Sequence, residues 1–97
     1  MPGEGTGTAS DALVGELREQ ITKLDRELLE AINRRIELVG RLHDYKQAHG
    51  IPLRDPSRES SLLAELREHN QGPLSAQGVV EFFGHLLELV RRELHGV

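Results

Sequence analysis

The sequence has 97 residues, of which 37% are hydrophobic and 29% charged, a composition typical of one soluble globular domain and not of a disordered or membrane-spanning chain. Its net charge is −4 and its aromatic residues are one tyrosine and two phenylalanines, which argues against nucleic-acid binding through phosphate contacts and base stacking. Because no cysteine is present, disulfides, thiolate catalysis and cysteine-ligated metal sites are excluded.

The first nine residues, MPGEGTGTA, differ in composition from the rest of the chain. They lack the basic and apolar regions of a secretory signal peptide. We therefore expect a disordered tail over residues 1–9, a helical domain over residues 10–97 and a cytoplasmic location.

A single long helix is predicted over residues 10–49, which contain no proline. Ser10 is a suitable N-cap, and Gly50 followed by Pro52 supplies the stop. Apolar residues recur at spacings of three and four, as on one helical stripe: Leu17, Ile21, Leu24, Leu28, Ala31, Ile32, Val39 and Leu42. Such a helix is ~57 Å long at about 1.5 Å per residue, whereas a domain of this size has a radius of gyration of roughly 13 Å. The other segments are too short to cover the stripe, so we expect it to pack against a second copy of the chain.

Arg35 and Lys46 lie where this stripe would otherwise carry apolar residues. A buried unpaired charge loses several kcal/mol of hydration, so long basic side chains either extend to water or face an anion. The two residues are eleven positions apart, close to the ~10.8 residues of three helical turns, and so lie almost in line. The pattern permits two interpretations: two solvated cations, or a pair that flanks one small polyanion.

Two shorter helices are predicted after the long one, over residues 56–70 and 76–95. Asp55 before Pro56 is a strong start signal, with aspartate as N-cap and proline at the first helical position. Ser75 is the N-cap expected for the last helix, which is strongly apolar. We therefore predict an all-α fold with three helices per chain and no strand.

No motif for covalent, nucleotide or metal chemistry occurs in the sequence. The histidines form no i, i+4 pair and no HExxH motif: His43, His49, His69, His85 and His95. We therefore expect no metal site. Four arginines are interpreted as solvated or paired with a glutamate at i+4: Arg34, Arg67, Arg91 and Arg92. The remaining signal is a set of cations with one glutamate beside it: Arg18, Arg35, Lys46, Arg54, Arg58 and Glu59.

The run LREQITKLDRELLEAINRRIELVGRLHDYK, followed by RDPSRE, resembles the all-helical chorismate mutases of the shikimate pathway, the AroQ class. Their pattern has an LRxxIxxLDxxLLxLLxxR opening, a lysine eleven residues beyond its last arginine, and an R-D-x-x-R-E box at the start of the second helix. The matching positions here are Leu17, Arg18, Ile21, Leu24, Asp25, Leu28, Leu29, Arg35, Lys46, Arg54, Asp55, Arg58 and Glu59. The resemblance covers nearly all of the first two predicted helices.

The resemblance implies an intertwined homodimer that shares its active sites, and an isomerase that converts chorismate to prephenate in phenylalanine and tyrosine biosynthesis without a cofactor. It also implies that Arg18 of the partner chain and Arg35 hold the two substrate carboxylates. Bidentate geometry suits guanidinium for this task. Lys46 would bind a carboxylate and the ether oxygen, which gains negative charge as its bond to carbon breaks.

The box at the start of the second helix carries the other implied roles. Glu59, together with the backbone at Asp55, would hold the ring hydroxyl, and Arg58 would order this network. A pericyclic step needs no acid or base, so fixed cations would act by holding the reactive conformer and stabilising developing charge.

The last helix departs from the family pattern. Aligning Phe83 with the family's aromatic residue places Val90 where a small hydroxyl residue is common and Leu94 where glutamine or glutamate is usual. Glu93 would substitute for the second group only if the helix rotated. This departure keeps two alternatives open: a sister enzyme acting on 4-amino-4-deoxychorismate or isochorismate, and a non-catalytic helical dimer or regulatory module. A second enzyme of the aromatic pathway is a candidate partner.

Overall fold

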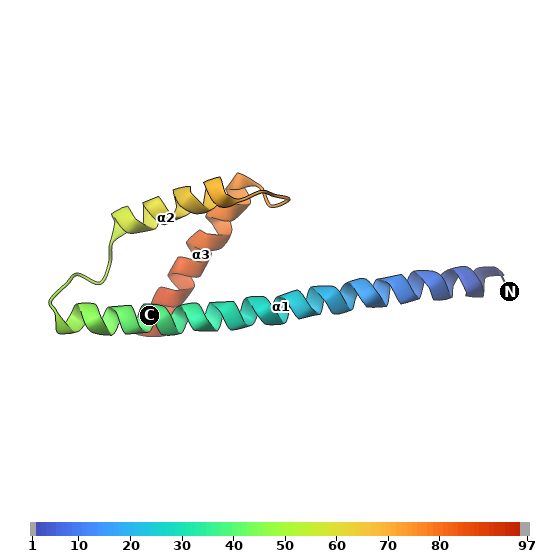
Figure 1. Cartoon of the computed structure of the whole chain (residues 1–97), viewed down its shortest axis with the longest axis horizontal. Coiled ribbons are helices and arrows are strands. Elements are labelled where there is room, and N and C mark those ends of the chain that lie inside the picture. The colour runs from blue at the N-terminus through green and yellow to red at the C-terminus, as the bar shows by residue number, and fades with distance from the viewer. Residues whose placement is uncertain (1, 96–97) are drawn as a thin grey trace. The chain divides into compact units, whose positions relative to one another are not determined.

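The computed structural model describes the backbone of residues 2–95 and the side chains of residues 10–95. Within these residues there are three helices and no strand: α1 (Pro2–Ala48), α2 (Pro56–His69) and α3 (Ala76–His95) (Figure 1). The all-α class and the very long first helix are therefore confirmed. Helix α1 begins at Pro2 and not at Ser10, and proline is tolerated in the first turn of a helix. Whether residues 1–9 are a disordered tail stays a prediction.

The chain divides into two compact units, Met1–Arg35 and Ile36–Val97, with the boundary inside α1. In the first unit, α1 carries a row of apolar side chains at spacings of three and four. Five side chains of this row are 42% to 62% exposed in the single chain: Val14, Leu17, Ile21, Leu24 and Leu28. Monomeric proteins rarely expose a continuous apolar row of this length to solvent.

The end of α1 follows the glycine stop that the sequence predicted. Gly50 has a φ of +65°, a left-handed conformation that favours glycine. The N–H of Ile51 donates to the carbonyl of Lys46 at 2.8 Å, and the N–H of Gly50 donates to the carbonyl of Gln47 at 3.5 Å. These two bonds form a Schellman motif, which closes the helix and turns the chain into the connection before α2.

Side-chain caps begin α2 and α3 at the predicted residues. Asp55 Oδ1 accepts from the N–H of Arg58 at 3.0 Å, with Pro56 at the start of α2. Ser75 Oγ accepts from the N–H of Gly78 at 2.9 Å at the start of α3. Each cap satisfies one backbone donor that a helix start leaves without a partner, which fixes where the helix begins.

The second unit is packed around α3. Val79, Leu86 and Val90 are its most buried apolar side chains, at 3%, 7% and 3% exposure. Helix α2 packs along α3 with the half-buried side chains of Leu62, Leu63 and Leu66. At the other end of α3, Leu94 approaches α1 so closely that a Cβ on Gly40 would lie 3.3 Å from its Cδ2.

His43 lies at this contact between α1 and α3. Its ring stacks on that of His95 with centroids 5.1 Å apart, and its Nδ1 is buried without a hydrogen-bond partner among the described residues. Burial lowers the pKa of His43 below 6.5, the positive charges of His95 and Lys46 lower it further, and Asp44 partly opposes the shift. The folded protein therefore resists protonation of this ring.

Replacing His43 with glutamine is expected to reduce the acid sensitivity of the fold. The pKa of His43 is lowered in the folded state. As the pH falls, the unfolded chain is therefore protonated at His43 at a higher pH than the folded protein. The free energy of unfolding should thus fall as the pH drops below about 6.5 in the wild type, and less steeply in His43→Gln. Urea unfolding at fixed protein concentration, at pH 7.5 and at lower pH, measures the difference. An identical pH dependence of both proteins would contradict this role of His43.

Candidate active site

The residues at the start of α2 are held together by its N-cap. The N–H of Arg58 donates to the side chain of Asp55, and the N–H of Glu59 donates to the Asp55 carbonyl at 3.1 Å. Arg54, directly before the cap, places its Nη2 3.9 Å from Oε2 of Glu59. The cap therefore fixes the backbone of three predicted site residues, Asp55, Arg58 and Glu59, at the start of α2.

Glu59 also contacts α3. Arg91 Nη2 donates to Glu59 Oε1 at 2.9 Å, which is both a hydrogen bond and an ion pair. The side chains of Glu59 and Arg91 are 29% and 36% exposed, whereas that of Arg54 is 64% exposed. The sequence interpretation of Arg91 as solvated or paired with a glutamate at i+4 is thus wrong, because its partner lies on another helix.

An open groove of about 480 Å³ runs between α2 and α3 beside this ion pair. Helix α2 and the residue before its cap line it with Arg54, Pro56, Glu59, Ser60 and Leu63. Helix α3 lines it with Val80, Glu81, Gly84, His85, Leu87, Glu88 and Arg91. Five of these lining residues are charged, and Leu63, Val80 and Leu87 are apolar, so the groove offers both ionic and apolar contacts.

The rotation of α3 decides which of its side chains reach this groove. Val90 is 3% exposed and belongs to the core, and Leu94 packs near Gly40. Neither position therefore presents a side chain to the groove, and Arg91 is the α3 side chain that contacts Glu59. Sequence reasoning missed Arg91, although its spacings of three, four and seven from Glu88, Leu87 and Gly84 place all four on one helical face.

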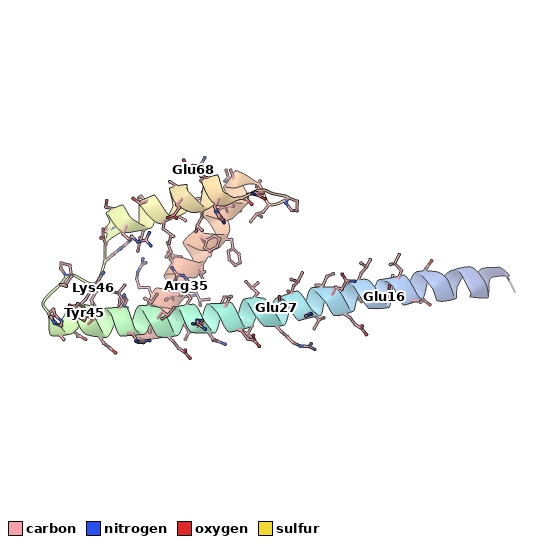
Figure 2. The ribbon with its side chains drawn as sticks, in the orientation of Figure 1. Glu16, Glu27, Arg35, Tyr45, Lys46 and Glu68 are labelled. Carbon is pink, nitrogen blue, oxygen red and sulfur yellow. The ribbon has the colours of Figure 1, made fainter. Side chains whose placement is uncertain are left out.

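Lys46 lies at the end of α1, with its side chain directed to the connection between α1 and α2 (Figure 2). Its Nζ donates to the carbonyl of Leu53 at 3.4 Å, a long hydrogen bond that leaves its other donors available. Leu53 immediately precedes Arg54 in the sequence. Lys46 is half-buried, so an anionic ligand is more strongly attracted to it than to a fully exposed lysine.

Arg18 and Arg35, the other predicted site residues, lie on α1 in the unit Met1–Arg35. Arg18 is exposed. The structure thus brings Asp55, Arg58 and Glu59 together at the start of α2, next to Arg54, while the roles of all the predicted site residues stay predictions.

The groups at this site suit binding and electrostatic stabilisation more than covalent chemistry. Guanidinium, ammonium and carboxylate groups provide ionic hydrogen bonds, which are stronger than neutral ones. Among residues 2–95, no three histidine, aspartate or glutamate side chains gather as they would around a metal ion. None of the helices within that range is both long enough and apolar enough to cross a membrane.

The chain matches a known protein family and is similar to a solved structure. Residues 17–94 match the family described as "Chorismate mutase type II". The structure of chorismate mutase (form I) from Thermus thermophilus is similar to this chain, with a TM-score of 0.78 and 27% sequence identity. That alignment covers 79% of this chain and 96% of the Thermus chain.

Two curated relatives match shorter segments. The T-protein of Enterobacter agglomerans is 40% identical over 52 residues, which are 54% of this chain and 14% of that protein. The 4-amino-4-deoxychorismate mutase of Streptomyces venezuelae is 43% identical over 44 residues, which are 45% of this chain and 43% of that protein. The chain therefore spans less than half the length of these relatives.

Proposed function

Because the chain belongs to the chorismate mutase type II family, we propose that it catalyses the rearrangement of chorismate to prephenate. The observation that carries this proposal is the family match over residues 17–94, which includes all six of the predicted site residues. They are Arg18, Arg35, Lys46, Asp55, Arg58 and Glu59. The presence of Glu59 in an open groove between α2 and α3 supports the proposal.

The reaction is intramolecular, so the protein has two tasks. It must hold the flexible substrate in the conformation in which the breaking C–O bond and the forming C–C bond are aligned, and it must stabilise the charge that develops between them. In the proposed mechanism Arg35, with Arg18 of the second chain, binds the carboxylates and fixes that conformation. Lys46 donates to the ether oxygen as its bond to carbon breaks.

Glu59 acts at the other end of the proposed substrate. Its carboxylate accepts a hydrogen bond from the ring hydroxyl, while the backbone at Asp55 supplies a second polar contact. The N-cap of α2 and the ion pair to Arg91 hold this carboxylate before the substrate arrives. Because these groups are fixed in advance, little reorganisation is needed during the reaction.

We propose in addition that the protein works as a homodimer in the cytoplasm. The exposed apolar row of α1 supports the dimer, since a second α1 is a partner of matching length and pattern. Among residues 10–95 of the single chain, only Val79, Leu86 and Val90 are buried, which is a small core for a domain of this size. An aromatic-pathway enzyme stays a candidate partner.

A sister reaction on 4-amino-4-deoxychorismate is the second candidate. The observation in its favour is the similarity to the Streptomyces venezuelae protein of that name. The family match covers a longer part of the chain, and the structural relative that covers most of it is a chorismate mutase. We therefore place chorismate first. A reaction on isochorismate and a non-catalytic role are weaker alternatives. The activity of Lys46→Ala relative to the wild type distinguishes a non-catalytic role from catalysis.

Replacing Lys46 with alanine is expected to lower kcat/KM for chorismate by about 10²–10³ or more, because one preorganised donor to the transition state is lost. Steady-state kinetics measure the effect, and circular dichroism and sedimentation check that the fold and the dimer persist. Lys23→Ala is the matched control, since Lys23 is an exposed lysine of the same helix. Activity within about twofold of wild type in Lys46→Ala would contradict the proposed mechanism.

Placing a charge in the apolar row of α1 is expected to weaken the dimer. Leu24 is 62% exposed in the single chain, and Leu24→Lys removes one buried leucine from each chain of a dimer. The dimer dissociation constant should rise at least about a hundredfold. Sedimentation measures it, with Thr22→Lys as a control that adds the same charge beside the row. A monomeric wild type, or a variant as dimeric as the wild type, would contradict the dimer.

A further inference from the structure

We propose that Arg91 makes the site selective for a substrate that carries a neutral hydroxyl, and not an ammonium group, at the ring position bound by Glu59. This inference rests on the proposed function, because it assigns Glu59 to that ring substituent. It goes further in naming the residue that distinguishes the two substrate classes.

The ion pair between Arg91 and Glu59 is the first step of the argument. Nη2 of Arg91 lies 2.9 Å from Oε1 of Glu59, and both side chains are about two-thirds shielded from solvent, at 36% and 29% exposure. Charges in such an environment interact more strongly than they do on an open surface. Arg91 is therefore expected to stay beside Glu59 when a ligand enters the groove.

The second step concerns the bonding capacity that Glu59 retains. Its Oε1 accepts from Arg91, whereas Oε2 lies 3.9 Å from Arg54, which is beyond hydrogen-bond distance. Oε2 is thus available to accept a hydrogen bond from a substrate group. A hydroxyl needs one such acceptor and brings no charge.

An ammonium group meets a different environment at the same place. An aliphatic amine is a cation at neutral pH, so it would be a second positive group beside a carboxylate that is already paired with Arg91. Repulsion between like charges opposes its binding, while the hydroxyl avoids that cost. The groove therefore favours the hydroxyl at this position.

The other charged groups of the groove do not reverse this preference. Glu81 and Glu88 also line it from α3, but both are exposed to solvent, and Glu81 accepts a hydrogen bond from Gln77 at 3.2 Å. Exposed charges are strongly screened. His85, the remaining titratable group of the lining, is exposed as well.

A purely structural role for Arg91 makes a different prediction. Arg91 joins α2 to α3, so its loss would lower stability and reduce activity towards both substrates alike. Selectivity, in contrast, changes the ratio of the two activities. The readout is therefore kcat/KM for chorismate divided by kcat/KM for 4-amino-4-deoxychorismate, measured with the full chain.

Four variants test the proposal. Arg91→Gln and Arg91→Met remove the charge, and Arg91→Met retains an aliphatic stem if the glutamine variant folds poorly. Arg91→Lys keeps the charge without the guanidinium. Arg92→Gln removes the same charge from the adjacent, exposed position outside the groove lining and serves as the matched control.

We expect the wild type to prefer chorismate and the uncharged Arg91 variants to lower the ratio about tenfold, equivalent to about 1.4 kcal/mol. Arg91→Lys and Arg92→Gln should keep the wild-type ratio within about threefold. A wild type that converts chorismate, with a ratio unchanged in Arg91→Gln and Arg91→Met, would overturn this inference alone. A folded wild type that converts neither substrate would overturn the proposed function, and the inference with it.

Discussion

The ion pair between Glu59 and Arg91 is the contact on which the arrangement of the candidate site depends. It joins the first turn of α2 to the last turns of α3 across the groove, at a distance of 2.9 Å. Partly exposed ion pairs contribute only about 1 kcal/mol or less to stability. The core of α3, formed by Val79, Leu86 and Val90, is therefore the larger contributor to the fold. We interpret the ion pair as a contact whose main role is to hold the Glu59 carboxylate in a fixed position.

Local sequence signals predicted the helices well, because helix boundaries depend on residues close in the chain. Gly50, Asp55 with Pro56, and Ser75 each act within one turn, and each lies where a helix ends or begins. The N-cap in turn brings Asp55, Arg58 and Glu59 together in the first turn of α2, so their proximity follows from the sequence, while their roles stay predictions. Family resemblance contributed the assignment of their roles, which the fold alone does not provide.

The apolar residues of α3 lie on about half of its circumference, at about 100° per residue. They are Val79, Val80, Phe82, Phe83, Leu86, Leu87, Leu89, Val90 and Leu94. The three most buried of them, Val79, Leu86 and Val90, lie at the centre of this face, so hydrophobic periodicity indicates which side of α3 packs inward. Arg91 was missed because its partner is 32 residues away in the sequence, a separation that no local pattern reports. Apolar Val90 and Leu94 are accounted for by their packing.

The central claim is that this chain rearranges chorismate with its own fixed charges and without a covalent intermediate. The most direct test follows the loss of chorismate absorbance after addition of the purified chain, without added metal or cofactor, and identifies the product by acid conversion of prephenate to phenylpyruvate. The account predicts one molecule of prephenate for each chorismate consumed. A folded dimer that leaves chorismate intact, or that releases pyruvate from it, would contradict the account.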